Sequence, residues 1–243
     1  MKVELKRKDE FHKVLENYEP SEDAKQTLKR IKLVILLGIT GAGRNTIINH
    51  LVETDRYHYI VSDTTRPPKV RDGKLEENAV HYYFRSEDEV LADIKAGKYL
   101  EAEVLHEQQV SGISIRELED SAASGKISIN EVDFLGTVNI MKYKPDAFMF
   151  FIVPPSFDEW LRRLNSREEM SDHEFRNRAK TAVHILEQAL GSDKYHFVIN
   201  DSSMDSAIFI DRWVHGDHDP AHDIATREIA REILVQLKAH LDV

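Results

Sequence analysis

A glycine-rich segment between an apolar run and a helical pattern constrains this chain most. Glycines at 38, 41 and 43 follow Leu33-Val34-Ile35-Leu36-Leu37. Glycine lets the backbone turn its N–H groups into a concave nest for an anion, and the next helix adds the positive end of its dipole. The segment predicts a phosphate-binding loop, although an ordinary strand-to-helix turn is the alternative. The loop comprises Gly38, Thr40, Gly41, Ala42, Gly43, Arg44, Asn45 and Thr46.

Two positions of this loop depart from the usual phosphate-binding pattern, which ends in Lys followed by Ser or Thr. The chain has Arg44 and Asn45 there. Arginine keeps the positive charge but is longer and planar, so it does not simply reproduce a lysine point contact. Asn45 offers an amide oxygen to magnesium and Thr46 offers a hydroxyl, so weaker magnesium binding is expected at these two residues.

Composition and charge limit the kinds of partner. The chain has 243 residues, 41% of them hydrophobic, no cysteine, and a formal net charge of -10. A chain of this length can bury a substantial core, and without cysteine it has no disulfides or thiolate metal sites. Its negative charge argues against nonspecific electrostatic binding of nucleic acid. The early apolar run from Ile31 to Ile39 is interrupted by Lys32 and is too short for a bilayer. We expect a soluble cytoplasmic protein with no membrane or nucleic-acid partner.

The order of strand and helix patterns favours a parallel α/β sheet, because apolar strand candidates alternate with helical intervals. The interval from 62 to 126 is the longest, and it holds a short strand-like piece from His81 to Phe84 and a helix start at Ser86 with Glu89 in capping-box spacing. We interpret it as an inserted substrate-binding subdomain. The strand candidates are Leu33 to Leu37, Tyr59 to Val61, Ile127 to Val132, Ala147 to Val153 and Phe197 to Ile199.

From about Lys32 to about Arg212 the chain resembles a guanylate kinase, on motifs that occur in order. This resemblance implies a three-layer P-loop kinase fold at 31–213, with a nucleoside-monophosphate-binding insertion at 62–126 and a helical lid at 163–178. It also implies ATP, Mg²⁺ and GMP as ligands. Besides the loop, the motifs are Ser62-Asp63-Thr64-Thr65-Arg66-Pro67-Pro68-Lys69, Asn78-Ala79-Val80-His81-Tyr82, Tyr99-Leu100-Glu101, Glu131-Val132-Asp133, Pro154-Pro155-Ser156 and Val198-Ile199-Asn200-Asp201.

The segment from Ser62 to Lys69 suits a phosphate monoester. Arg66 can donate hydrogen bonds to two phosphate oxygens at once, and Lys69 adds a second positive charge. By resemblance, Ser62, Arg66, Lys69 and Tyr82 hold the phosphate of the acceptor nucleotide, with Lys69 standing where the family generally has arginine. The alternative is a basic surface turn beside a core tyrosine.

Glu101 points to guanine, because one carboxylate can accept both the ring N–H and the exocyclic amino group of that base, which adenine does not offer. This favours GMP or dGMP. The family pairs the carboxylate with a hydroxyl after a Tyr-Gly step, whereas this chain has one extra residue before Gly112. The hydroxyl comes from Ser111 or Ser114, or is missing, and an exposed strand glutamate is the alternative for Glu101.

Glu131 and Asp133 are two residues apart on an expected strand, so both side chains are predicted to point the same way near its carboxyl end, where open α/β sheets bind ligands. They are candidates to orient water around Mg²⁺ (Glu131) or to contact the acceptor nucleoside (Asp133). Ordinary acidic residues at a strand end are the alternative.

In the lid, Arg167 and Arg178 resemble the two arginines that close over the transferring phosphoryl group, and Asn200 falls among the donor-binding residues of the resemblance. Phosphoryl transfer depends on positioning and charge stabilisation, which guanidinium groups supply on closure. Glu168 follows Arg167 where the family usually has glycine. A charged, solvated helix face is the alternative.

Two extensions lie outside the resemblance. Residues 1–30 predict two helices, the second opening at Ser21, and residues 214–243 predict a helix from Pro220 to about Leu241 with Asp219 as its cap. The His and Asp residues at 215–223 include metal-ligand types, but the helix start is the better interpretation.

The leading function is phosphoryl transfer from ATP to GMP. The alternatives are a guanylate kinase-like binding or scaffold protein that lacks the chemistry, as Arg44 and Asn45 suggest, and a kinase for another phosphorylated small molecule.

Overall fold

The computed structural model describes residues 4–71, 73–166 and 170–241, and the chain divides into two compact units. The first unit comprises Met1–Leu33, His58–Asn130 and Val138–Ala147, and the second comprises Val34–Tyr57, Glu131–Thr137 and Phe148–Val243. The N-terminal extension therefore belongs to the same unit as the insertion, and the C-terminal extension belongs to the unit that carries the glycine-rich loop.

Parallel strands form the core of the second unit, as the sequence predicts. They lie in the order β11 (His196–Ile199), β10 (Phe148–Val153) and β1 (Leu33–Gly38), with Leu36 beside Phe150 and Phe151 beside Phe197. Every residue of β1 is buried, which explains its continuous apolar sequence, since helices cover both faces of such sheets.

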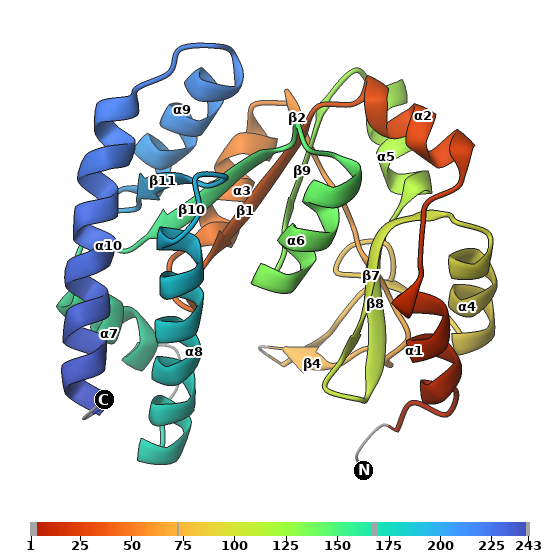
Figure 1. Cartoon of the computed structure of the whole chain (residues 1–243), viewed down its shortest axis with the longest axis horizontal. Coiled ribbons are helices and arrows are strands. Elements are labelled where there is room, and N and C mark those ends of the chain that lie inside the picture. Colours follow the sequence, from red (N-terminus) through yellow and green to blue (C-terminus); the bar gives the residue numbers. More distant parts are fainter. Residues whose placement is uncertain (1–3, 72, 167–169, 242–243) are drawn as a thin grey trace. The chain divides into compact units, whose positions relative to one another are not determined.

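Helices supply the connections that parallel strands require. In the second unit, α10 runs alongside α8 and also contacts β11 (Figure 1). The helix predicted from Pro220 is confirmed as α10, with Asp219 accepting a hydrogen bond from His222 N at 3.1 Å. The helices of this unit are α3 (Arg44–Glu53), α7 (Phe157–Asn165), α8 (Asp172–Leu190), α9 (Ser203–Val214) and α10 (Pro220–Leu241), and α6 (Phe134–Tyr143) begins in it.

The first unit is built around a four-stranded sheet in the order β6 (Tyr83–Phe84), β3 (Asp63–Thr64), β8 (Gln109–Ser114) and β7 (Tyr99–Leu105). Its helix α4 (Glu87–Lys95) begins with the capping box predicted at Ser86 and Glu89. Its other elements are α1 (Lys8–Glu16), α2 (Glu22–Arg30), α5 (Ile115–Ala123), the hairpin β4 (Val70–Arg71) and β5 (Lys74–Leu75), and the strand β9 (Ile127–Glu131).

Strand β2 (Tyr57–Tyr59) begins and ends two residues before the range expected from the sequence. Ile60 N still donates to Ile129 O at 2.9 Å, but Val61 N donates to the Glu117 carboxylate at 3.1 Å. The chain leaves the ladder because a side chain takes the place of a strand neighbour.

The N-terminal extension packs against the insertion within the first unit. Leu5 and Phe11 share a hydrophobic cluster with Val90, Leu91 and Tyr99. The second helix starts where predicted, with the Ser21 hydroxyl accepting from Ala24 N. Burial of a Phe11-sized side chain contributes about 2 kcal/mol, so this extension stabilises the unit that contains it.

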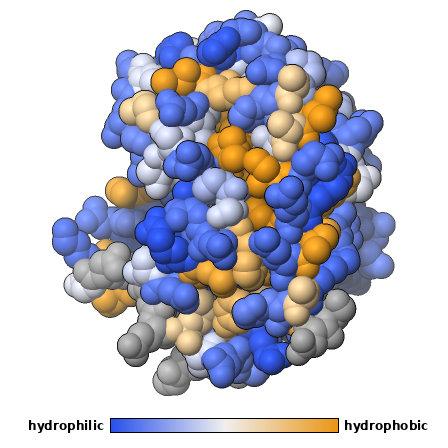
Figure 2. Space-filling model, turned by 90° about the vertical axis from the view of Figure 1, so that its left-hand side faces the viewer, coloured by the Kyte–Doolittle hydropathy of each residue, from blue (hydrophilic) through white to orange (hydrophobic). Residues whose placement is uncertain are grey.

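Figure 2 shows one face of the molecule, on which hydrophobic residues are interrupted by hydrophilic ones. Ile224 and Val235 on α10 are exposed. Over the part of the chain that the structure describes, no helix combines the length and apolar character needed to cross a bilayer.

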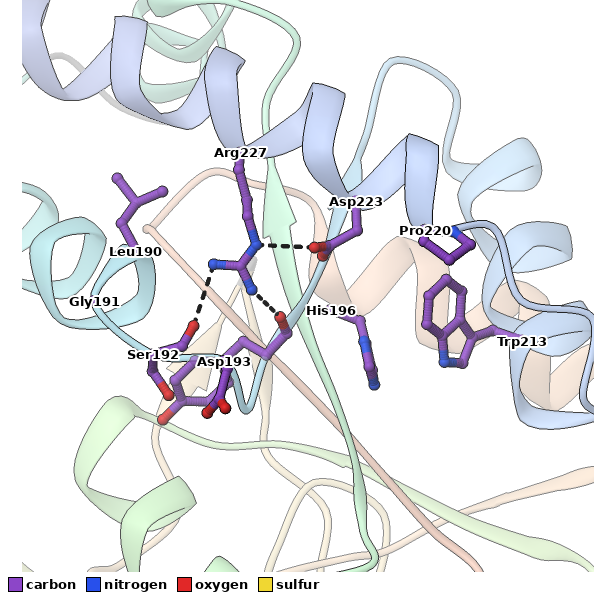
Figure 3. A pocket seen from close by; sticks show the side chains of 10 residues that line it. Leu190, Gly191, Ser192, Asp193, His196, Trp213, Pro220, Asp223 and Arg227 are labelled. Carbon is purple, nitrogen blue, oxygen red and sulfur yellow. Dashed lines mark hydrogen bonds and ion pairs between the residues drawn. The ribbon is translucent and has the colours of Figure 1, made fainter.

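Arg227 attaches α10 to the end of β11 (Figure 3). Its Nε donates to Asp223 at 2.9 Å, and its other nitrogens donate to the carbonyl oxygens of Ser192 and Tyr195 at 3.2 and 2.6 Å. The guanidinium carbon also lies 4.3 Å from the centre of the Phe197 ring. One largely buried side chain thus binds the helix, the strand and the turn before it.

Replacing Arg227 by Ala is expected to lower the free energy of unfolding by about 2–3 kcal/mol, because it leaves Asp223 and two carbonyl oxygens without a charged donor. Urea unfolding measures this loss. Arg231→Ala is the matched control, since Arg231 pairs with Glu228 on the exposed face of the same helix, and it is expected to change stability by less than about 0.5 kcal/mol. Equal effects of the two variants would contradict the anchoring role.

Candidate functional site

The glycine-rich loop forms a pocket in the second unit. Gly43 has φ of 92° and caps the start of α3 in a left-handed conformation that glycine adopts without strain. Asn200, which is buried, closes the loop by donating from Nδ2 to Ala42 O at 2.6 Å. Trp160 Nε1 donates to Thr40 O at 2.8 Å. The cavity of about 280 Å³ is lined by Gly41, Gly43, Thr46, Arg163, Ser166, Asn200, Asp201 and Ser203.

Arg44 occupies the first residue of α3 and faces the end of β9. Its Nε lies 3.4 Å from Glu131 Oε2, and its Nη1 donates to Val132 O at 3.4 Å. Both charged side chains are about a quarter exposed. The positive charge at the usual lysine position therefore has an acidic neighbour in the same unit, so the variant loop keeps its cation in a fixed place.

Arg163 lies at the loop, although the sequence singled it out only as the start of the lid. Its Nη2 donates to Asn200 O at 2.9 Å and its Nε donates to Glu159 at 2.7 Å. Hydrogen bonds from Arg162 and Arg163 lower the pKa of Glu159 to about 2, so the carboxylate stays charged. The available signal was the position of Arg163 on a helix that opens directly after Pro154-Pro155-Ser156.

The structure describes one of the two predicted lid arginines. Arg178 lies on α8 and pairs with Glu174 one turn earlier, while Arg167 lies outside the described residues. Arg178 is therefore part of a charged helix surface, and its role over a phosphoryl group stays a prediction.

Glu131 and Asp133 do not lie on one strand, contrary to expectation. Strand β9 ends at Glu131, and Asp133 Oδ1 accepts a hydrogen bond from Gly136 N at 2.8 Å. An aspartate at a helix start bonds to the free backbone N–H groups of the first turn, which ends the strand earlier than the apolar pattern suggests. The two side chains are consequently placed by different elements.

The predicted phosphate clamp of the first unit contains a buried ion pair that the sequence did not reveal. Arg66 is 5% exposed, and both of its terminal nitrogens bind Glu76, with Nη2 to Oε1 at 3.0 Å. Its guanidinium carbon lies 4.7 Å from the centre of the Tyr82 ring. The burial of Arg66 contradicts the alternative of a basic surface turn.

The other two members of the predicted clamp, Lys69 and Ser62, make different contacts. Lys69 has an exposed side chain, while its backbone N donates to Glu76 Oε2 at 2.9 Å. The Ser62 hydroxyl accepts from Asn130 Nδ2 at 3.2 Å. The structure thus brings Arg66 and Tyr82 together, and Glu76 organises the backbone that carries Lys69.

Glu101 is buried on β7, with 8% of its surface exposed, so it is not the exposed strand residue of the alternative interpretation. It lies opposite Ile113 on β8, and Glu103 lies opposite Ser111. Residues directly opposite share a face and neighbours along a strand alternate, which puts Ser111 on the Glu101 face and Ser114 on the other. Within the described residues, both serine hydroxyls are buried without a hydrogen-bond partner.

Several of the His and Asp residues at 215–223 make contacts that stabilise the fold. Asp219 caps α10 and Asp223 binds Arg227. His196 and His218 pack against Trp213 with ring centroids 4.5 and 4.9 Å away, and burial lowers the pKa of His196. In the described ranges, no group of three or more His, Cys, Asp or Glu side chains is arranged to hold a metal ion.

Comparisons with known proteins show which family of proteins the chain is similar to. The guanylate kinase family model matches residues 30–210. The chain is 32% identical over 178 residues to the guanylate kinase of Polaromonas sp., covering 73% of this chain and 82% of that protein. It is 29% identical over 173 residues to guanylate kinase 1 of Oryza sativa, covering 70% of this chain but only 44% of that longer protein.

Among solved structures, the chain resembles the guanylate kinase from Anaplasma phagocytophilum with a TM-score of 0.54 and 22% sequence identity. The match covers 89% of this chain and 99% of that one. At this identity the likeness shows the fold, which is that of the P-loop kinases, as the sequence predicts.

Proposed function

The chain belongs to the guanylate kinase family, and from that premise we propose that it transfers a phosphoryl group from ATP to GMP or dGMP. Family membership supports nucleoside-monophosphate kinase activity in general. One observation supports GMP as the acceptor: Glu101 is buried, and Ser111 lies on the same face of the sheet. The carboxylate accepts the two donors of guanine, and the hydroxyl is available to its carbonyl oxygen.

The loop in the second unit is proposed to hold ATP. Its backbone N–H groups and the α3 N-terminus would bind the phosphates, and Arg44 and Arg163 would supply positive charge. Asn200 keeps the loop closed. Arg66, Tyr82, Ser62 and Lys69 are proposed to hold the GMP phosphate, and Asp133 to contact the nucleoside.

Mg²⁺ would neutralise charge on the donor phosphates. Thr46 fits the role of a Mg²⁺ ligand because it lines the pocket of the loop, and Asn45, the residue before it, also carries a side-chain oxygen. Glu131 is poorly suited to bind Mg²⁺ directly, because Arg44 lies 3.4 Å from its carboxylate. It suits the orientation of a metal-bound water instead. Arg167 and Arg178 are proposed to close over the transferring group.

A nucleotide-binding module without turnover is the second candidate. The observation that favours it is the replacement of the loop lysine by Arg44, whose guanidinium is engaged by Glu131 and Val132 O. This candidate predicts binding of both nucleotides and no formation of GDP.

Glu101→Gln tests the guanine assignment. The amide replaces one acceptor by a donor that faces the donors of the base, so kcat/KM for GMP is expected to fall about 100-fold. Steady-state kinetics with GMP and ATP measure this change. Glu107→Gln, the same substitution at an exposed position of the β7–β8 hairpin, is the control and should leave kcat/KM within a factor of two or so. Undiminished GMP use by Glu101→Gln would refute guanine recognition by Glu101.

A further inference from the structure

Tyr18 belongs to the N-terminal extension, before the residues that match the family, and it bonds to the first residue of β7. Its hydroxyl donates to Tyr99 O at 2.6 Å and accepts from Tyr99 N at 2.8 Å. One phenol therefore satisfies both backbone polar groups of Tyr99. It does at this position what a neighbouring strand does elsewhere in a sheet.

The position matters because β7 is an edge strand and is irregular at this point. The sheet ends at β7, and its pairing with β8 shifts register between Tyr99 and Glu101. A bulge of this kind adds one residue to a strand and redirects the side chains that follow. Glu101 is the first paired residue after the shift, and it lies two residues beyond the position that Tyr18 holds.

Tyr18 is itself held firmly. Its carbonyl oxygen accepts a hydrogen bond from the Tyr143 hydroxyl, and its ring packs against the cluster that contains Phe11 and Val90. Burial raises the pKa of the Tyr18 phenol, and the negative charge of Glu101 adds to the rise. The hydroxyl consequently stays protonated and continues to donate to Tyr99 O at neutral pH.

Tyr99 also reaches the strand that leads into the phosphate clamp. Its hydroxyl donates to Asp63 Oδ2 at 2.6 Å. Asp63 is buried on β3 and accepts from Arg85 at 3.1 Å and from Arg116 at 2.9 Å. A continuous set of hydrogen bonds thus joins the extension to β7 and β3, which carry the base-recognition and phosphate-binding parts of the first unit.

We infer that Tyr18 is a positioning residue for acceptor recognition, which orients Glu101 by fixing the backbone of Tyr99 at the β7 bulge. The inference rests on the proposed use of GMP. It gives the N-terminal extension a role in substrate selection, because removal of one hydroxyl outside the family-matched region should alter discrimination among purine nucleotides.

Tyr18→Phe removes only the hydroxyl. We expect KM for GMP to rise about tenfold and the preference for GMP over IMP, which lacks the exocyclic amino group, to fall about tenfold, while KM for ATP stays unchanged. Amide hydrogen exchange of Tyr99 and Leu100, measured by mass spectrometry, should become faster. An unchanged KM for GMP and an unchanged GMP-to-IMP preference would overturn the inference.

Phe11→Leu serves as the matched control, since it loosens the same hydrophobic cluster and leaves both Tyr18–Tyr99 hydrogen bonds in place. It should lower the melting temperature without changing the GMP-to-IMP preference. If Phe11→Leu changes that preference as much as Tyr18→Phe does, a merely structural role is shown and the inference fails. Wild-type protein that neither binds nor phosphorylates GMP refutes the proposed function itself, and the inference with it.

Discussion

Arg66→Met is expected to lower the free energy of unfolding by about 3–5 kcal/mol and to abolish GMP phosphorylation. The stability loss follows because Glu76 loses the guanidinium that binds both of its carboxylate oxygens in a buried place. The activity loss follows because Arg66 is the proposed phosphate clamp. Urea unfolding and a GDP-formation assay measure the two effects separately.

The double variant Arg66→Met with Glu76→Leu separates these roles. Replacing both members of a buried ion pair by apolar side chains of similar size is often neutral for stability. The double variant should therefore recover most of the lost stability and none of the GMP turnover. Recovered turnover would show that Arg66 does not bind the phosphate, and a stable single variant would contradict the buried pair.

Gly43→Ala is expected to reduce ATP affinity at least about 100-fold. A Cβ at this position would lie 2.2 Å from Asn200 Nδ2, the atom that closes the loop onto Ala42 O, so Asn200 must move and the nest must open. The left-handed backbone, with φ of 92°, adds about 1–2 kcal/mol of strain for any L-residue with a side chain. Titration of the purified protein with ATP measures the affinity.

Gly216→Ala is a closely matched control in the same unit. Gly216 has φ of 96°, and its added Cβ would meet nothing within 4 Å. The Gly216→Ala variant should therefore have the backbone strain without any steric clash, and it should bind ATP as the wild type does. Equal loss of ATP affinity in both variants would mean that conformational strain, and not the contact with Asn200, governs the loop.

Local signals with a clear physical cause predicted the elements of the fold well. The capping box at Ser86, the cap at Ser21 and the Asp219-Pro220 helix start all appear as expected, because side chains bond to backbone groups only a few residues away. The apolar strand of the second unit was equally clear, since a strand buried on both faces is continuously hydrophobic.

Several pairings of the candidate site could not be predicted from the sequence. The partner of Arg66 is Glu76, ten residues away on the other side of the short β4–β5 hairpin, and no helix or strand periodicity links the two. Asp133 caps a helix, and the strand expected to carry it stops at Glu131 because that local bond competes with the ladder. Which of Ser111 and Ser114 shares a face with Glu101 depends on the register of β7 against β8, which the spacing of residues in the sequence does not reveal.

The residues that hold the candidate site in shape were also missed, because their chemistry is expressed only in three dimensions. Arg163 is one of several charged residues on an amphipathic helix, and its bond to Asn200 O singles it out only in the folded unit. Tyr18 lies in a segment without a family counterpart, and its link to Tyr99 spans 81 positions of sequence.

The most direct measurement of the central claim is ATP-dependent conversion of GMP to GDP with Mg²⁺ by the purified full chain, read out by chromatography of the nucleotides. The proposed function predicts GDP formation from GMP and dGDP from dGMP, no product from AMP, CMP or dTMP, and loss of product in Gly43→Ala. Folded wild-type protein that binds ATP and GMP yet forms no GDP would contradict the kinase assignment and establish a nucleotide-binding module in its place.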